Sequence, residues 1–472
     1  MSTANLERCT TIELPYLKDS HHYFAHIRNL EWPIWLDSCH NAEQHNPHAR
    51  YDIISANPSH KIIATTESCI AVATENEGAT TVFKDCWAAI EQLTPHATPM
   101  AEHSPLPFNG GALGYLGYEA AHNKQTLNNP HKLDCDIPLA LVGIYNWAIV
   151  QDHQLQTCTL VHNENCNQGL ISKLKSVLSV PSATPKPERA HFAAQVFTES
   201  TTKDAYLKQL DQIQSYILDG DCYQTNLTQR FEARFSGDPL EAYLKLRTQL
   251  PSPFSCYFET EFGSVMSHSP ERFISCSNKE IVAQPIKGTA RRGRNPDEDR
   301  ALAQGLKQSS KDQAENLMIV DLLRNDLSKC CEVNSVKTPK LFELESYANV
   351  HHLVSTVTGK LKQSETPLSL LKSCFPGGSI TGAPKIRAME IIEELETSRR
   401  SIYCGSIGYL GFDGQMDTNI AIRTAATYGD RVFVWGGGGI VADSIAEDEY
   451  EESLMKIRRI LEGLSDKSTT SR

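Results

Sequence analysis

The chain has 472 residues, of which 40% are hydrophobic and 22% are charged, proportions that are ordinary for a globular protein. Its 45 lysine and arginine residues against 57 aspartate and glutamate residues give a net charge of −12. No basic cluster stands out, which argues against nucleic acid as a partner, and an anionic substrate would need local cations or a metal inside its site.

The first half of the chain is predicted to be rich in strands. Residues 1–30 are polar throughout, so we expect no signal peptide. Apolar runs at 52–56 and 139–150 predict buried strands, and the whole run 137–150 is too short and too interrupted to span a membrane. The 14 cysteines form no C-x-x-C pair. We therefore expect free thiols, no zinc site and a cytoplasmic location.

A composition break divides the chain. Prolines at positions 181, 185 and 187 stand among polar residues, which predicts a linker at 181–202. The linker separates an N-terminal subdomain, 1–180, from a larger C-terminal domain, 203–464. The polar residues 465–472 are expected to form a flexible tail.

The second half is predicted to mix helices with short strands. Apolar residues at helical spacing predict a helix over 203–219, with Gly220 as its C-terminal cap. A second helix is expected at 310–328. A third is expected from Ser444, where Ser444 and Glu447 have the spacing of a capping box. Short strands are expected within 401–412 and 431–435.

The last predicted helix carries one group of residues suited to chemistry. Glu449, Glu452 and Lys456 fall on one of its faces. Directly upstream, Gly436–Gly439 leave backbone amides open to the close approach of a carboxylate or phosphate. The alternative interpretation is a tight turn followed by a solvated acidic face.

Two further residues have more than one interpretation. Glu315 is expected on the inner side of the helix over 310–328, where its partner is a divalent cation or a nearby lysine or arginine. Lys287 lies between Pro285 and Gly288 at the end of an apolar strand. If it is held in the interior, its pKa falls and its amine becomes a nucleophile; otherwise it is a surface lysine in a turn.

The segment 375–385 is glycine-rich but lacks the spacing of a phosphate-binding P-loop. We expect a turn that enters a helix with Pro384 near its first turn, and this helix start could hold an anion. No Gly-x-Cys-x-Gly elbow with a downstream histidine occurs, so the chain shows no means of hydrolysing glutamine.

Five motifs together resemble the chorismate-utilising enzymes. They are Pro285-Ile286-Lys287-Gly288-Thr289, Ala314-Glu315-Asn316-Leu317-Met318, Val350-His351-His352-Leu353, the segment 375–385 and the region 436–456. The resemblance covers essentially the whole chain. It implies an α/β (α+β) fold, a two-domain sandwich of large, mostly antiparallel sheets with helices outside.

The resemblance also implies a role for each matching residue. Glu315 and Glu452 match Mg²⁺ ligands, with Glu449 as their acidic neighbour, and Glu271 matches the general acid that protonates the departing 4-hydroxyl. His352 is implied to orient the same end of the substrate. The positions implied to bind the substrate are Arg423, Tyr403, Lys456, Gly437, Gly438, Gly439, Thr289 and Gln224.

Two positions distinguish branches of the family. Members that add water carry a lysine where this chain has Gln224, and glutamine cannot take a proton from water. Members that form anthranilate usually have alanine where this chain has Lys287, whereas those that aminate C4 have the lysine. The resemblance thus implies conversion of chorismate and ammonia to 4-amino-4-deoxychorismate for 4-aminobenzoate and folate synthesis, with Lys287 attacking C2. An anthranilate-forming large subunit is the alternative.

The family also implies partners. Ammonia would come from a separate glutamine amidotransferase subunit in a heterodimer. Leu36-Asp37-Ser38 resembles the element with which relatives bind tryptophan, so Ser38 marks a possible tryptophan pocket; the alternative is an ordinary strand end.

Overall fold

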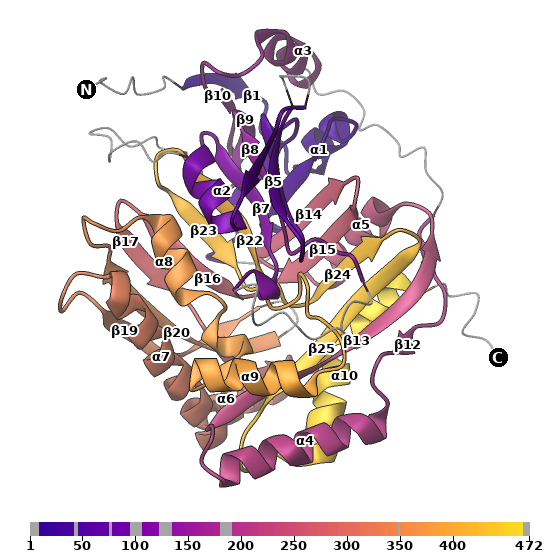
Figure 1. The fold of residues 1–472 in the computed structure, drawn as a ribbon, viewed down its shortest axis with the longest axis vertical. Coiled ribbons are helices and arrows are strands. Elements are labelled where there is room, and N and C mark those ends of the chain that lie inside the picture. Colours follow the sequence, from indigo (N-terminus) through magenta and orange to yellow (C-terminus); the bar gives the residue numbers. More distant parts are fainter. Residues whose placement is uncertain are drawn as a thin grey trace.

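Two large sheets form the body of the protein (Figure 1). The computed structural model describes residues 9–41, 46–74, 78–94, 106–121, 135–179, 191–347 and 350–465. Within these ranges, every pair of neighbouring strands in both sheets is antiparallel. This confirms the predicted sandwich of antiparallel sheets.

The strands of the first sheet follow one another in the spatial order β1 (Thr10–Leu14), β10 (Thr157–His162), β9 (Trp147–Asp152), β3 (Tyr51–Ser55), β2 (Ile34–Asp37), β14 (Phe254–Thr260), β15 (Gly263–Ser269), β24 (Thr424–Tyr428), β25 (Arg431–Ile440), β13 (Gln224–Ser236) and β11 (Ala193–Ala194). Two short strands also pair with β13, namely β12 (Thr198–Glu199) and β21 (Gly382–Ala383).

The second sheet has the order β18 (Ile286–Arg291), β20 (Val350–Lys360), β17 (Glu280–Ala283), β16 (Arg272–Ser277), β23 (Met416–Asn419), β22 (Ser406–Gly411), β7 (Gly111–Leu116), β8 (Ala140–Tyr145), β4 (His60–Ala64), β5 (Cys69–Ala73) and β6 (Thr80–Phe83). Strand β19 (Lys337–Ser346) also pairs with β20.

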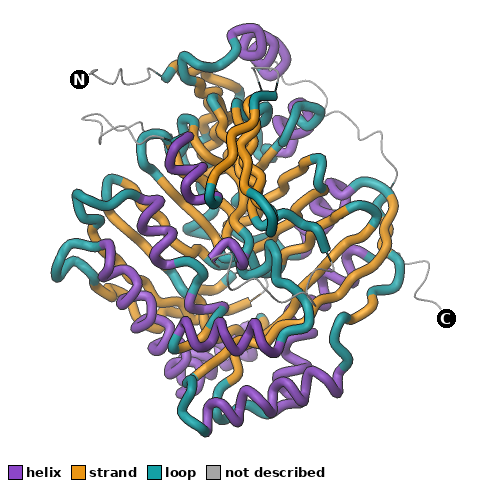
Figure 2. The backbone as a smooth tube through the Cα atoms, viewed as in Figure 1, coloured by secondary structure: helices purple, strands orange, loops and turns teal. Residues whose placement is uncertain are grey.

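Helices lie around the sheets (Figure 2). They are α1 (His21–Ile27), α2 (Cys86–Leu93), α3 (Gln168–Leu178), α4 (Lys203–Leu218), α5 (Pro239–Gln249), α6 (Pro296–Gln308), α7 (Ser310–Cys330), α8 (Pro367–Cys374), α9 (Lys385–Leu395) and α10 (Ala446–Leu464). Short 3₁₀ turns occur at Tyr118–Ala121 and Gly378–Ile380. None of the helices in the described ranges has the length and apolar character needed to cross a bilayer.

Each sheet combines strands from both sides of the predicted linker. In the first sheet β2 pairs with β14, and in the second β7 pairs with β22. Residues 181–190 of the predicted linker and 466–472 of the predicted tail lie outside the described residues. The division into domains at 1–180 and 203–464 therefore stays a prediction, and strand pairing links the two parts extensively.

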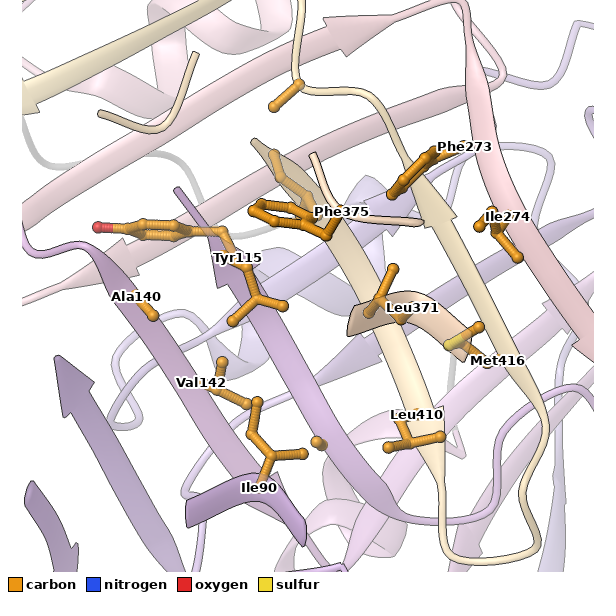
Figure 3. Packing of buried hydrophobic residues seen from close by; sticks show 14 of the residues in the cluster. Ile90, Tyr115, Ala140, Val142, Phe273, Ile274, Leu371, Phe375, Leu410 and Met416 are labelled. Carbon is orange, nitrogen blue, oxygen red and sulfur yellow. The ribbon is translucent and has the colours of Figure 1, made fainter. Parts of the chain in front are cut away.

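Apolar side chains from the two sheets and from the covering helices meet in a buried core (Figure 3), and two further buried clusters lie elsewhere in the fold. Ile90 of α2 and Leu371 of α8 pack with strand residues such as Val142, Ile274 and Leu410. Full burial of side chains of this size stabilises the fold by roughly 1.5–3 kcal/mol each. Because Phe273 and Ile274 belong to this core, it also fixes the chain beside Glu271.

Helix predictions were largely confirmed. Helix α4 begins at Lys203, and Gly220 follows it with φ +84°, the left-handed conformation expected of a cap. Helix α7 covers the predicted 310–328. The capping box was wrong: α10 begins at Ala446, and the Ser444 hydroxyl donates to Glu449 (2.7 Å) while Glu447 pairs with Lys203.

One strand prediction needs correction, because the run 139–150 is two strands, β8 and β9, separated by Asn146. The strand expected at 431–435 is confirmed and extends to Ile440. The glycines 436–439 are part of it and pair with β13, with Gly439 opposite Asn226, so the alternative interpretation of a turn does not hold. Strand propensity is low for glycine, so the tertiary pairing with β13 overrides it here.

A buried ion pair joins the segments that lead to the candidate site. The Arg400 side chain is only 1% exposed and pairs with Glu396 at 2.6 Å. Its remaining N–H groups donate to the backbone oxygens of Ile380 (2.7 Å) and Asn226 (3.2 Å). Glu396 also accepts the Thr228 amide at 2.9 Å. The pair therefore ties β13 to the turn at 378–380.

We predict that Glu396→Ala destabilises the protein by about 3–5 kcal/mol, because it leaves a buried arginine without its partner. Thermal or urea unfolding monitored by circular dichroism measures the effect. Glu390→Ala is the control: it removes an exposed partner of Arg387 and should cost less than about 1 kcal/mol. Equal losses in the two variants would contradict the structural role of Arg400.

Candidate active site

Lys287 lies in an interruption of the strand ladder. The pairing of β18 with β20 shifts register between Ile286 and Thr289, so Lys287 and Gly288 form a bulge. Such a bulge redirects a side chain out of the regular alternation. Burial lowers the pKa of Lys287, and the charge of Lys456 adds to this shift. The carboxylates of Glu315, Glu271 and Glu452 oppose it.

Glu271 stands directly before β16 and is 4% exposed. Its backbone is held by the Ile420 amide, which donates to the Glu271 carbonyl at 3.0 Å. Burial raises the pKa of its carboxyl to about 7, while a hydrogen bond from Ser379 and the charge of Lys287 limit that rise. A carboxyl of this kind keeps a proton near neutral pH and can act as an acid.

Three carboxylates from two helices face the same region as Lys287. Glu315 belongs to α7, and Glu449 and Glu452 belong to α10. Burial raises the pKa of Glu315, while Lys287 counteracts the rise. The charge of Lys456, at 2.9 Å, lowers the pKa of Glu452.

Sequence reasoning missed one cation of this group. Lys311, in the first turn of α7, lies 3.6 Å from Glu449, and the charges of Glu449, Glu315 and Glu452 outweigh burial and raise its pKa. A lysine four residues before Glu315 on the same helix is the signal that could have found it.

The predicted Mg²⁺ ligands are three carboxylates, Glu315, Glu449 and Glu452. In the described part of the chain, no three carboxylate, histidine or cysteine side chains converge closely enough to hold an ion. The carboxylates of Glu315, Glu449 and Glu452 instead face ammonium groups. Carboxylate oxygens are nevertheless the ligands that Mg²⁺ prefers, so the chemistry of these side chains is compatible with the ion.

The glycine strand provides an open edge. Strand β24 pairs with β25 only as far as Val434, so beyond it, among the described residues, the β24 side of β25 has no strand neighbour. The Gly437 carbonyl accepts a hydrogen bond from Lys456 at 3.1 Å. A Cβ at Gly438 would lie 3.5 Å from both Glu449 and Lys456, which places this glycine beside the charged cluster.

Gln224 begins β13, the strand that pairs with β25. It is fully buried, and a Cβ at Gly439 would lie 2.1 Å from its Nε2, so a larger residue there would displace the Gln224 side chain. Its amide nitrogen donates to Asn226 at 3.5 Å. The position that distinguishes family branches is therefore in contact with the glycine strand.

Arg423, Tyr403 and His352 complete the group. Arg423 is in the loop before β24 with φ +52°. Burial lowers the pKa of its guanidinium, while Tyr403 and Glu271 oppose that shift. The Tyr403 ring stacks on Trp435 with centroids 6.2 Å apart. Burial and the charge of Arg423 lower the pKa of His352 to about 3, so this imidazole is neutral at physiological pH.

The neutral His352 ring is oriented by a neighbour. Its Nδ1 lies 2.9 Å from the Thr289 hydroxyl, and the two residues are also register partners in β18 and β20. Thr289 thus supports the histidine in this structure. The sequence predictions placed Thr289 against the substrate, a role that stays a prediction.

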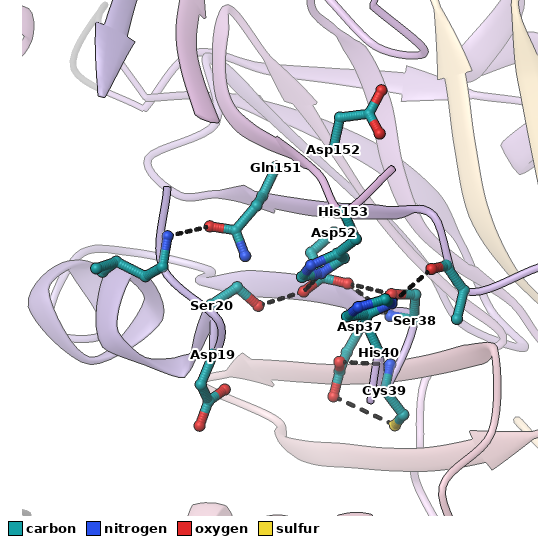
Figure 4. A network of polar contacts seen from close by, with 12 residues as sticks. Asp19, Ser20, Asp37, Ser38, Cys39, His40, Asp52, Gln151, Asp152 and His153 are labelled. Carbon is teal, nitrogen blue, oxygen red and sulfur yellow. Dashed lines mark hydrogen bonds and ion pairs between the residues drawn. The ribbon is translucent and has the colours of Figure 1, made fainter. Parts of the chain in front are cut away.

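Ser38 lies apart from this group, in a polar network (Figure 4). Its amide and hydroxyl both donate to Asp52, at 2.8 and 2.7 Å. Burial acts to raise the pKa of Asp52, but hydrogen bonds from His153, Ser20 and Ser38 hold it at about 2. The hydroxyl of Ser38 is therefore engaged by the protein itself.

A cavity of about 240 Å³ opens beside this network, between the two sheets. Leu36 and Asp37 line it from the predicted tryptophan element, with Tyr51, Phe254 and Arg272 among the other wall residues. A second cavity, of about 480 Å³, is lined by other residues, including Asn57 and Trp147, and contains none of the predicted site residues.

The sandwich and its charged cluster place the protein in a known class. The profile of the chorismate binding enzyme family matches residues 34–462, and the chain belongs to this family. The predicted family membership is thereby confirmed.

Two individual proteins with the same name are similar to this chain over most of its length. Aminodeoxychorismate synthase component 1 of Escherichia coli K12 is 43% identical over 94% of this chain and 95% of its own length. The protein of the same name from Bacillus subtilis is 35% identical over 90% of this chain and 91% of its own length.

Solved structures agree on the fold. Anthranilate synthase component I from Streptococcus pneumoniae TIGR4 superposes with a TM-score of 0.76 at 31% identity, covering 89% of this chain and 94% of that one. The isochorismate synthase MenF from Escherichia coli has a TM-score of 0.72 at 17% identity over 98% of this chain and 95% of its own, which supports the fold alone.

The bulge at Lys287 allows a direct test. Gly288 has φ +85°, and a Cβ there would lie 2.9 Å from Asp312 and Leu306. Gly220 has nearly the same φ but open space around it, so it serves as the control. We predict that Gly220→Ala costs about 1–2 kcal/mol from backbone strain, whereas Gly288→Ala costs about 1–3 kcal/mol more from overpacking. Thermal unfolding measures both, and equal costs would contradict the packing around the bulge.

Proposed function

We propose that this chain converts chorismate and ammonia to 4-amino-4-deoxychorismate, the precursor of 4-aminobenzoate and folate. The observation that carries the proposal is Lys287, an amine whose pKa is lowered by burial and which shares its surroundings with Glu271, an acid with a pKa of about 7. The similarity to aminodeoxychorismate synthase component 1 over nearly the whole chain supports the same reaction.

In this proposal the substrate's carboxylates bind to cations and open amides. Arg423 suits one carboxylate, because its planar fork can donate two parallel hydrogen bonds. Tyr403, Lys456 and the amides of Gly437–Gly439 suit the other. Gln224 lies against Gly439 of the glycine strand, and its amide offers the substrate a polar contact without a titratable proton. His352, neutral and held by Thr289, orients the C4 end.

Glu315 and Glu452, with Glu449 beside them, are the residues we propose to hold Mg²⁺. The ion would supply positive charge for a substrate carboxylate while keeping several water ligands. The chain's own part is to supply carboxylates from α7 and α10, and to pair Glu449 with Lys311 and Glu452 with Lys456 when no ion is bound.

The covalent chemistry begins with the neutral amine of Lys287. Its attack on C2 shifts the ring double bonds and expels the C4 oxygen, which leaves as water with the proton of Glu271. Ammonia then attacks C4, the double bonds shift back, and the C2–N bond breaks to release the lysine amine. The two displacements place nitrogen at C4, and their sum exchanges hydroxyl for amine with release of one water.

We propose that a glutamine amidotransferase subunit supplies the ammonia in a heterodimer, in the cytoplasm. The names of the similar proteins designate them as component 1, which supports a second component. The absence of a cysteine nucleophile elbow from the sequence also supports a separate source of ammonia.

Tryptophan is the ligand we propose for the cavity beside Leu36 and Asp37. Its aromatic and charged wall residues suit an aromatic amino acid. Ser38 would support the cavity wall and would not bind the ligand directly, because its hydroxyl already donates to Asp52.

The identity of the product tests the proposed reaction. With chorismate, Mg²⁺ and ammonium, the chain should form 4-amino-4-deoxychorismate, and Lys287→Ala should lose this activity almost completely because C4 amination needs the first attack at C2. Chromatography with mass detection measures the product. Lys340→Ala, an exposed lysine of β19, is the control. Anthranilate as the main product, or full activity in Lys287→Ala, would support the anthranilate-forming alternative.

The pH dependence tests the acid. Glu271 must be protonated to act, so kcat/KM should fall as pH rises through about 7. Glu271→Gln should lower kcat by about 10²- to 10⁴-fold and remove this limb from the residual activity. Glu280→Gln, at the exposed start of β17, should retain both the rate and the limb. A Glu271→Gln enzyme with an unchanged pH profile would exclude Glu271 as the acid.

A further inference from the structure

Arg272 connects the two segments that carry Glu271 and Lys287. It opens β16 directly after Glu271, and its guanidinium forms a two-point ion pair with Asp417, with Nε–Oδ1 3.1 Å and Nη2–Oδ2 3.0 Å. The remaining nitrogen, Nη1, donates to the side-chain oxygen of Gln284 at 2.8 Å. The fork therefore reaches from the segment of the acid to the segment of the lysine.

Gln284 occupies a weak point of the strand ladder. Strand β17 pairs with β20 as far as Ala283, and β18 resumes the pairing at Ile286. Between them, the Pro285 carbonyl accepts one hydrogen bond from the Ser355 amide, at 3.3 Å. The register stays the same from Ala283 to Ile286 and shifts only beyond it, at Lys287. The Gln284 side chain is thus an anchor for the chain immediately before the bulge.

A second link between the two segments depends on the acid itself. The Ile286 amide donates to the Glu271 carboxyl, and this bond and the Lys287 charge both favour the ionised form. In the proposed reaction Glu271 gives up and regains a proton, so that link changes during turnover. The bond from Arg272 to Gln284 involves no group that changes protonation, and Asp417 keeps the arginine in place throughout.

The arginine is also fixed on its other side. Its guanidinium lies 5.0 Å from the centre of the Phe254 ring, and its side chain is 19% exposed at the cavity beside Leu36. An ammonium could not reproduce this arrangement, because a point charge cannot hold Asp417 and Gln284 in two fixed directions at once.

We propose that Arg272 is a positioning residue that sets the distance between Glu271 and Lys287 through its hydrogen bond to Gln284. The inference rests on the catalytic roles proposed above for those two residues. Displacements of about 1 Å between reacting groups can cost up to about a hundredfold in rate. The bond should therefore affect the rate of the chemical step more than the binding of chorismate.

Gln284→Met tests this inference, because it removes the acceptor and keeps nearly the same volume. We expect kcat for ammonia-dependent amination to fall by about tenfold or more while KM for chorismate changes less than about threefold. The limb of the pH profile assigned to Glu271 should move to higher pH, since the carboxyl loses contacts that favour ionisation. Arg272→Lys should show the same pattern.

Two further variants complete the test. Gln284→Glu offers the same guanidinium an acceptor and should restore kcat to within about threefold of the wild type. Gln415→Met is the control, since Gln415 makes comparable side-chain hydrogen bonds, to Leu106 and Asp413, at a turn of the same sheet. Thermal unfolding of each variant separates positioning from loss of structure.

The inference would be overturned if Gln284→Met behaved like Gln415→Met, with normal kcat and an unmoved pH limb. It would also be overturned if Gln284→Glu failed to restore kcat. These results are distinguishable from failure of the proposed function, in which Lys287→Ala itself would remain active. An inactive Lys287→Ala enzyme beside a fully active Gln284→Met enzyme would reject the positioning role alone.

Discussion

The rest of the structure depends on one constraint. The amine of a lysine must be held among carboxylates and other ammonium groups in a partly closed site. Lys287, Lys311 and Lys456 face Glu315, Glu449 and Glu452, so positive and negative groups occur in equal number. Glu449 is buried, and a buried charge is tolerated only when it is compensated. In the proposed reaction a divalent cation and a substrate with two carboxylates enter together, and the balance is preserved.

The two sheets serve this constraint by bringing distant parts of the chain to one place. Strand β25 contributes an open glycine edge because β24 stops pairing at Val434. Strand β18 contributes Lys287 through a bulge, and the residue before β16 contributes Glu271. The buried pair of Arg400 and Glu396 holds β13 and the turn at 378–380 together beneath them. Irregular points of the strand ladders thus carry the chemical groups, and regular pairing holds them in place.

Much of the fold could be predicted from the sequence, for identifiable reasons. Helices α4 and α7 followed from apolar periodicity, a local signal. The glycines 436–439 were given a turn as one interpretation, because their strand conformation is imposed by pairing with β13, more than 200 residues away in the chain. The capping box failed because Ser444 bonds to Glu449, an acid that faces the charged cluster.

In the candidate site, too, local patterns could be predicted from the sequence, whereas contacts between distant segments could not. The motifs around Lys287, Glu315 and Glu452 identified the region, because each keeps its local spacing. Lys311 was missed because its partner, Glu449, is on another helix. Arg272 and Gln284 are the sequence neighbours of Glu271 and Pro285, but their contact is visible only once β16 and the link between β17 and β18 are placed in the sheet. Ser38 was recognised by pattern, whereas its engagement with Asp52 is visible only in three dimensions.

The central claim is that Lys287 forms a bond to the substrate. Intact mass measurement after incubation with chorismate and Mg²⁺, without ammonia, tests it most directly. The account predicts an adduct with the mass of chorismate less one water, mapped to Lys287 by peptide analysis and absent from Lys287→Ala. An enzyme that forms 4-amino-4-deoxychorismate from ammonia at full rate but never carries the adduct, even when quenched during turnover, would contradict the claim.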